Sequence, residues 1–124
     1  MIRNIHYQLG LLHLIYLLVN VDDEISYQEV AFLTQVRTNA HIDIELFEGF
    51  VRSLIGKSER QIYQTGIQLM NLCSDEERMR AFIQLFQMAE ADGFLHAREV
   101  RLILYATRMS HTDIGEVLRR VELV

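Results

Sequence analysis

Two acidic segments of this chain carry residues whose types and spacing could bind a cation. Residues 21–30 read VDDEISYQEV and residues 91–100 read ADGFLHAREV, and in each an aspartate is followed seven residues later by a glutamate. The four carboxylates are Asp22, Glu29, Asp92 and Glu99. Clustered carboxylates repel one another unless a cation, protons or basic groups offset their charge. Because oxygen ligands suit calcium or magnesium better than zinc, these residues form a candidate site for one of those cations.

The same residues also have a purely structural interpretation. Asp-Gly is a common turn, and Glu29 can complete a capping box with Ser26, in which a serine and a residue three positions later satisfy free amides at a helix start. In the second segment His96 replaces the serine while Glu99 is kept. An EF-hand is excluded, because its ladder of alternating acidic ligands is absent. The sequence leaves helix capping and a functional acidic site both open.

Other side chains with chemical potential are scattered. His41 and His111 each stand two residues before an aspartate that can cap a helix, in turns expected to face solvent. His6 and His13 lie on an apolar segment, where core or rim packing is expected. The single Cys73 lies on an apolar stripe and is expected to be a buried, inert thiol. No phosphate-binding loop, nucleophile elbow or Glu-x-x-His pair occurs in the sequence.

These residues must be positioned by helices, because the sequence contains no proline and its apolar residues follow helical spacing throughout. Serine or aspartate capping signals precede several of the apolar stripes. Phe82 and Phe86 are expected in the core. So is a stripe made of Ile44, Phe47, Val51 and Leu54. The predicted helices span residues 3–20, 26–38, 43–55, 59–73, 75–90, 97–109 and 112–123. The first is apolar nearly all round and is expected at the centre of the bundle.

Sliding the chain by seventy residues aligns Asp22, Glu29, His41 and Asp43 with Asp92, Glu99, His111 and Asp113. This spacing predicts an internal duplication of a three-helix unit. We therefore expect a single all-α domain, a compact bundle of about seven helices over residues 1–124. The first repeat covers about 3–55, a connector helix about 59–73 and the second repeat about 75–123. If the repeats pack about a pseudo-twofold axis, the two acidic corners should lie on the same side.

Composition restricts the partner and the compartment. The chain has 124 residues and a formal net charge of -5, which argues against nucleic-acid binding, because phosphate contacts need a basic face. The apolar run near the N-terminus imitates a signal peptide, but no small-residue cleavage site follows it and it is too short to span a bilayer. One cysteine fits a reducing compartment. These features predict a cytoplasmic protein without membrane insertion.

The segment MAEADGFLHAREVRLIL resembles the repeated Ala-Asp-Gly turn, with a glutamate seven residues beyond the aspartate, of the tellurite-resistance TerB-like family. The N-terminal domain of a membrane-anchored DnaJ-type co-chaperone shares this module. The first copy departs from the motif, since Val21 and Asp23 replace the alanine and glycine. The resemblance implies a compact helical domain with an acidic surface proposed to bind divalent cations or partners. It implies a role in stress or tellurite resistance and no established enzyme activity.

Three functions therefore compete. The leading hypothesis is a non-enzymatic cytoplasmic helical module of the TerB-like type, which acts through a protein partner and a divalent cation at the acidic turns. The second is a metal-dependent enzyme that uses the carboxylate cluster, with His41, His96 or His111 as the general acid or base. The third is a structural scaffold that forms homo-oligomers, in which the acidic turns only cap helices.

Overall fold

The computed structural model describes residues 5–19, 27–39, 41–91 and 97–123, and within these ranges every regular element is a helix. The expected all-helical fold is confirmed, and each predicted boundary lies within two residues of the observed one. None of the described helices is long and apolar enough to cross a membrane. The seven helices are α1 (Ile5–Val19), α2 (Tyr27–Asn39), α3 (Ile44–Ser53), α4 (Glu59–Asn71), α5 (Asp75–Ala91), α6 (Ala97–Met109) and α7 (Ile114–Leu123).

Capping residues determine where several helices begin. At the start of α4, the backbone amide of Gln61 donates to the Ser58 hydroxyl at 3.2 Å, and the backbone amide of Ser58 donates to the side-chain oxygen of Gln61 at 2.9 Å. The Ser74–Glu77 pair forms the same reciprocal box at α5, with distances of 3.1 and 2.8 Å. Both predicted capping boxes are confirmed, because each pair satisfies amides that have no partner inside the helix. The third predicted box depends on Ser26, which lies outside the described residues.

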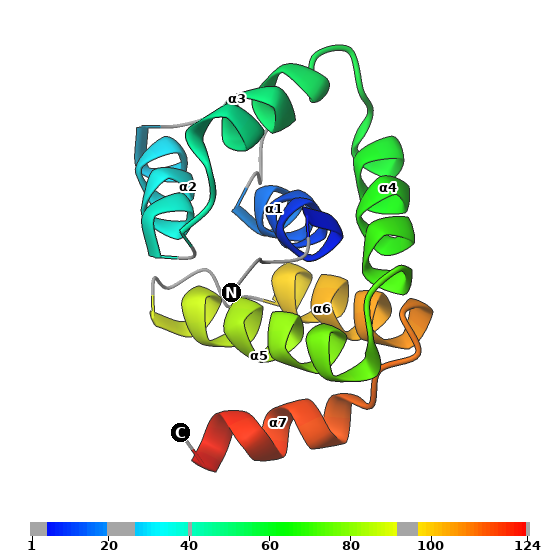
Figure 1. Cartoon of the computed structure of the whole chain (residues 1–124). Coiled ribbons are helices and arrows are strands. Elements are labelled where there is room, and N and C mark those ends of the chain that lie inside the picture. Colours follow the sequence, from blue (N-terminus) through cyan, green and yellow to red (C-terminus); the bar gives the residue numbers. More distant parts are fainter. Residues whose placement is uncertain (1–4, 20–26, 40, 92–96, 124) are drawn as a thin grey trace.

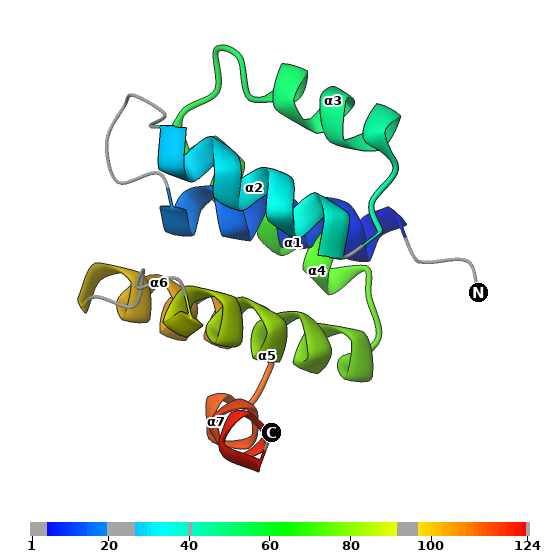
Figure 2. The same cartoon turned by 90° about the vertical axis from the view of Figure 1, so that its left-hand side faces the viewer.

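The first helix lies at the centre of the molecule, as its apolar composition predicts. Figure 1 views α1 almost end-on, surrounded by α2, α3, α4 and the α5–α6 pair. The last helix, α7, lies on the far side of α5 from α1 (Figures 1 and 2). The core is continuous from one side of α1 to the other. Its largest fully buried side chains include Leu11, Leu12, Leu14, Ile15, Leu18, Phe50, Met70, Phe82, Leu85 and Ile103.

Two glycines allow α1 and α4 to approach closely. A Cβ added at Gly10 would lie 3.3 Å from the Cβ of Leu69, and one added at Gly66 would lie 3.1 Å from the Cβ of His13. These distances are shorter than ordinary van der Waals contacts, so the two backbones pack at a separation that larger residues would increase. Cys73, two residues beyond the end of α4, is buried as expected, and burial raises the pKa of its thiol.

The core positions predicted on α3 and α5 agree only in part with the observed burial. Phe82 is fully buried, whereas Phe86 is only partly buried, so the expectation that both lie in the core holds fully only for Phe82. On α3, Ile44 is 49% exposed and Val51 is 46% exposed, which corrects the predicted core stripe. Phe47 and Leu54 of that stripe do pack, partly buried, against the core, and Phe50 is the buried residue of α3, so the inward face is rotated relative to the predicted stripe.

The α2–α3 and α6–α7 joints have the same backbone geometry, seventy residues apart. His41 has a φ of 54° and His111 a φ of 56°, both in the left-handed region. In each joint, the backbone amide of the residue after the histidine donates to the carbonyl oxygen five positions earlier. Ile42 donates to Arg37 at 3.0 Å, and Thr112 donates to Thr107 at 2.9 Å. This is the Schellman pattern of a helix end, with histidine in the position that glycine usually occupies.

The next helix also begins in the same way in both joints. Asp43 accepts a hydrogen bond from the Glu45 amide at 3.0 Å, and Asp113 accepts one from the Gly115 amide at 2.9 Å. These are the capping contacts predicted for the two aspartates, since a short carboxylate satisfies a free amide in the first turn. Both histidines are exposed, as expected of turn residues.

Candidate functional site

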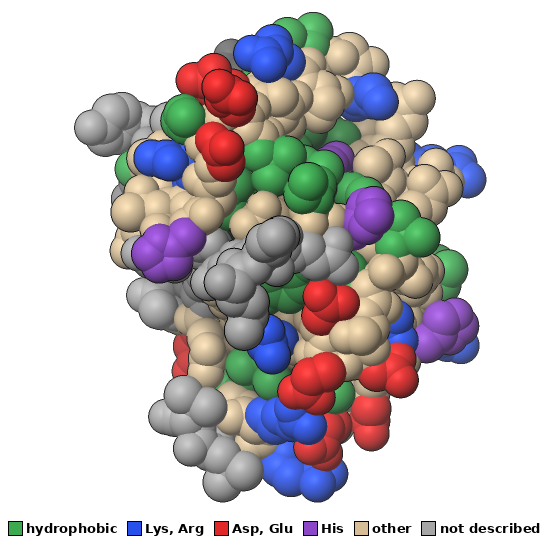
Figure 3. Space-filling model, in the orientation of Figure 1, with side chains coloured by type: hydrophobic (Ala, Val, Ile, Leu, Met, Phe, Trp, Pro, Cys, Tyr) green, Lys and Arg blue, Asp and Glu red, His purple; other side chains and the backbone are tan. Residues whose placement is uncertain are grey.

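A cavity of about 400 Å³ lies between α1, α3 and α4. Apolar side chains gather in the hollow between α3 and α1 (Figure 3). The cavity is open at one side, and its volume lies in the lower part of the range for small-molecule pockets, roughly 300–1,000 Å³. Most of its wall is apolar, and it includes Leu9, Leu46, Phe50, Leu54, Ile62 and Leu69.

The cavity exists because α3 packs differently from α7, although the two helices follow matched joints. On α7, Val117 is fully buried and Ile114 and Val121 are partly buried against the core, where α7 packs closely on α5. By contrast, α3 belongs to none of the closely packed helix pairs formed by the described residues. Its contact with the core runs through side chains, chiefly Phe50, while the space beneath remains partly unfilled.

His13 of α1 is the most buried polar residue of the cavity wall. Its side chain is 7% exposed, and its Nδ1 lies 2.6 Å from the Leu9 carbonyl oxygen one turn earlier. Its ring makes an edge-to-face contact with Phe50, with 4.9 Å between the ring centroids. Because a carbonyl oxygen only accepts, Nδ1 must carry the proton of this hydrogen bond. In the neutral imidazole Nε2 then keeps a lone pair and acts as an acceptor.

The charge of His13 follows from its burial. Removal from water lowers the pKa of His13 below its usual value of 6.5, because burial disfavours the charged ring. The hydrogen bond to the Leu9 carbonyl acts in the opposite direction and is the weaker effect, and the positive charge of Lys57 lowers the pKa further. The imidazole is therefore neutral at neutral pH, and the cavity floor offers a hydrogen-bond acceptor without charge.

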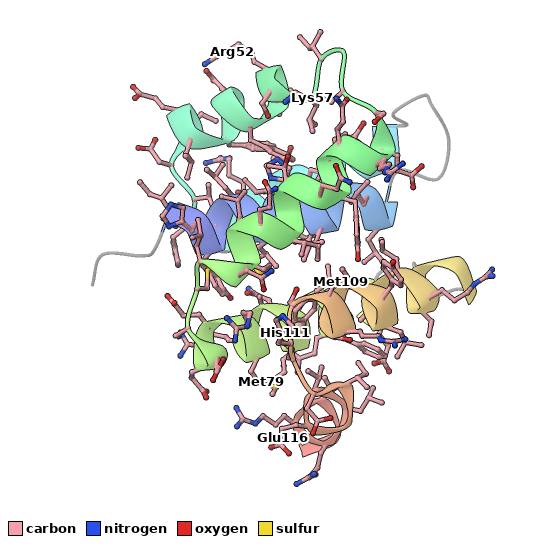
Figure 4. All side chains as sticks on the ribbon, turned by 90° about the vertical axis from the view of Figure 1, so that its right-hand side faces the viewer. Arg52, Lys57, Met79, Met109, His111 and Glu116 are labelled. Atoms are coloured by element: carbon pink, nitrogen blue, oxygen red, sulfur yellow. The ribbon has the colours of Figure 1, made fainter. Side chains whose placement is uncertain are left out.

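Polar groups from α3, α4 and their connection complete the cavity wall. Glu45, Ser53, Lys57 and Thr65 contribute to it. Figure 4 shows Lys57 on the connection between α3 and α4. The Ser53 hydroxyl donates to the Phe50 carbonyl at 2.5 Å, so this donor is engaged within α3. The cavity thus combines an apolar wall with a neutral acceptor and one charged group of each sign.

A second, shallower groove lies between α1, α4 and α6. It has a volume of about 640 Å³ and is lined by residues that include Leu17, Tyr63, Leu102 and Tyr105. The rings of Tyr63 and Tyr105 lie 5.7 Å apart. The Tyr63 hydroxyl oxygen is buried and has no hydrogen-bond partner in the described part of the chain. Burial and the neighbouring Tyr105 raise the pKa of Tyr63 to about 12, so this phenol stays neutral.

The predicted acidic site lies largely outside the described residues. Asp22 and Asp92 lie outside the described residues. Glu29 and Glu99 lie within described helices, each as the third residue, in α2 and α6 respectively. The helix ends that flank the two acidic segments lie at the same end of the molecule, the left side of Figure 2. Among the described residues, no group of three or more His, Cys, Asp and Glu side chains is placed to hold a metal ion.

The sequence interpretation missed the cavity. Its only local signal was His13, a single polar ring within the apolar run of the first helix. Phe50, which also lines the cavity and contacts His13, was not included in the predicted stripe of α3. The described His41 and His111 lie in exposed turns and are not among the residues that line the cavity.

Comparison with known proteins provides no independent assignment, since no protein-family model, curated protein or solved structure matches this chain.

Proposed function

We propose that this chain is a non-enzymatic helical binding module of the TerB-like type, and that it holds an apolar group in the cavity beneath α3. The observation that carries the proposal is the difference between two matched helices: α7 packs on α5, whereas α3 stands off and leaves a cavity of about 400 Å³. A cytoplasmic location and a protein partner belong to the same proposal. A partner that contributes an apolar side chain would fit it as well as a free ligand.

The surroundings of His13 favour binding over catalysis. A histidine that acts as a general base needs a nucleophile or substrate proton within hydrogen-bond reach. Within the described ranges, the one hydrogen bond of the His13 side chain is to the Leu9 carbonyl. The Ser53 hydroxyl, one of the two hydroxyl groups that line the cavity, donates to the Phe50 carbonyl instead. The arrangement thus supports holding a ligand more than it supports transforming one.

Filling the cavity tests this proposal. Gly49 lines the cavity, and a Cβ added there would meet only the end of the Arg52 side chain, at 4.0 Å. Gly49→Leu should therefore occupy the space without disturbing the core. We expect the fluorescent probe anilinonaphthalene sulfonate to bind the wild-type protein and to lose at least about tenfold in affinity with Gly49→Leu.

Gln68→Leu is the matched control, because it adds the same side chain at an exposed position of α4. It should leave binding of the probe unchanged. A wild-type protein that does not bind the probe, or equal binding by the Gly49→Leu variant, would contradict the assignment of the cavity as the binding site.

We also propose that the chain arose by duplication of a three-helix unit, α1–α3 and α5–α7. The two matched joints support this, since they share the left-handed histidine, the backbone hydrogen bonds and the capping aspartate at a separation of seventy residues. The different packing of α3 and α7 then represents divergence between the two copies. If a polypeptide of residues 75–123 alone folds into a helical unit, the result would strengthen this proposal.

A divalent cation at the acidic turns is the second candidate function. It is favoured by one observation: the ends of α1 and α5 and the starts of α2 and α6 lie at the same end of the molecule (Figure 2). Calcium and magnesium titration by calorimetry tests it, with Asp22→Asn and Asp92→Asn as variants. Weaker binding in both variants would support a shared site. Unchanged binding, with Glu29→Ala costing up to about 1 kcal/mol of stability, would assign the acidic residues to helix capping.

A further inference from the structure

The polar pattern of the cavity beneath α3 restricts what it can bind. A ligand that fills the apolar cavity but buries a polar atom of the wall without giving it a hydrogen-bond partner binds less favourably. The polar atom here is Nε2 of His13, a residue that lines the cavity and is 7% exposed, because Nδ1 is already engaged by the Leu9 carbonyl at 2.6 Å. Nε2 has a lone pair and no proton in this tautomer. It therefore selects for a hydrogen-bond donor and against a second acceptor.

The shape of the wall selects for an aromatic ring. Phe50 presents a ring on one side and already makes an edge-to-face contact with His13. Aromatic pairs in offset or edge-to-face geometry gain stability beyond that of their buried area. The rest of the apolar wall consists of aliphatic side chains such as Leu9, Ile62 and Leu69, which can pack against a flat ring without hydrogen bonding. A volume of about 400 Å³ accommodates a molecule of two fused rings.

We infer that the cavity binds a small aromatic molecule carrying one hydrogen-bond donor, such as an aromatic alcohol, with its hydroxyl on Nε2 of His13 and its ring against Phe50. This inference rests on the proposed function and names the class of ligand for that site. The hydroxyl donates to Nε2, the rings fill the apolar space, and Lys57 and Glu45 stay at the wall without a direct role in selection.

A series of three probes with the same ring system tests the donor. Naphthol can donate a hydrogen bond, whereas naphthalene has no group that donates or accepts one. Methoxynaphthalene keeps the oxygen atom as an acceptor but has no hydrogen to donate. We expect naphthol to bind the wild-type protein about three to ten times more tightly than either of the others, the gain of one net hydrogen bond. Nitrogen NMR of the imidazole should show a shift of Nε2 with naphthol and a smaller one with naphthalene.

His13→Phe provides the protein-side test. It keeps a ring in the wall and removes the acceptor, so the preference for naphthol should disappear while naphthalene still binds. If His13→Phe does not fold, the probe series on the wild-type protein decides the question by itself. Gly49→Leu should abolish binding of all three probes.

The outcomes separate the inference from the proposed function. Equal binding of the three probes, blocked by Gly49→Leu, would retain the cavity as a binding site and overturn the role of His13. Tighter binding of naphthoic acid than of naphthol, lost in Lys57→Ala, would assign the cavity to an anionic ligand and overturn the inference. No binding of any probe by the wild-type protein would overturn both.

Discussion

Gly66 of α4 lies directly against His13 of α1, such that a Cβ added at Gly66 would come within 3.1 Å of the Cβ of His13. The contact lies between α1 and α4, and it involves His13, which lines the cavity. Because the Cβ of His13 is fixed by the α1 backbone, it cannot move aside as the end of a flexible side chain could. The position of the imidazole therefore depends on the absence of a side chain at residue 66.

We predict that Gly66→Ala destabilises the fold. Overpacking of a core contact costs about 1–3 kcal/mol, and the better helix propensity of alanine returns about 1 kcal/mol. Gly49→Ala is the control, since only the end of the Arg52 side chain lies within 4.0 Å of its added Cβ, and it should stabilise α3 by about 0.5–1 kcal/mol. Urea unfolding measures both. Stabilisation by both variants would show that α1 and α4 can separate without loss.

The buried imidazole of His13 predicts a dependence of stability on pH. Its pKa is lower in the folded chain than the usual 6.5 of the unfolded chain, so the unfolded state binds the proton first as the pH falls. Stability should therefore decrease as the pH falls below about 6.5, and this loss should level off below the folded-state pKa.

Urea unfolding of the wild-type protein and of His13→Gln at several pH values checks this prediction. The variant has no group that titrates at position 13, so its stability should fall less over the same range. Parallel pH profiles for the two proteins would mean that His13 takes up its proton equally in both states. Glu45 and Lys57, which also line the cavity, are unchanged in both proteins and so cancel in the comparison.

Truncation of the two phenylalanines of α5 should give unequal losses. Phe82 is fully buried, and Phe82→Ala should cost about 3–5 kcal/mol because it leaves a cavity in the core. Phe86 is only partly buried, so Phe86→Ala should cost clearly less. Thermal unfolding of the two variants measures both losses of stability. Equal losses would indicate that α5 is rotated relative to its described position.

The left-handed histidines of the two joints should both be improved by glycine. His41→Gly and His111→Gly remove a Cβ from a conformation that costs a non-glycine residue roughly 1 kcal/mol, and neither side chain is buried. We expect each change to stabilise the fold by about 0.5–1 kcal/mol. Gly56→Ala, at a φ of 76°, should act in the opposite direction. A loss of stability in either histidine variant would indicate that its side chain makes a stabilising contact.

Local features of this fold could be predicted from the sequence. Ser58, Ser74 and Asp43 cap helices through atoms no more than three residues away, so their contacts are encoded by spacing alone. The central place of α1 followed from its composition, since a helix that is apolar on all sides must be surrounded.

The cavity could not be predicted, because it depends on how far α3 stands from α1. Ile44 and Val51 have the spacing of core residues, and their counterparts on α7 do pack against the core. Periodicity identifies an apolar stripe but does not determine the rotation of a helix about its axis when neighbouring helices leave space. The role of Phe50 is equally non-local, since it is defined by contact with His13, thirty-seven residues earlier. The acidic site remains a prediction, because Asp22 and Asp92 lie outside the described residues.

The loose attachment of α3 has a consequence for how the fold opens. A helix held by few buried contacts forms its own cooperative unit and opens at a lower free energy than the global transition. Amide hydrogens of α3 should therefore exchange with solvent by local opening, while those of α1 and α4 exchange only through global unfolding. The helix that covers the cavity should then also be cleaved by a protease more readily than α1 or α4, and a ligand seated beneath it would slow both processes together.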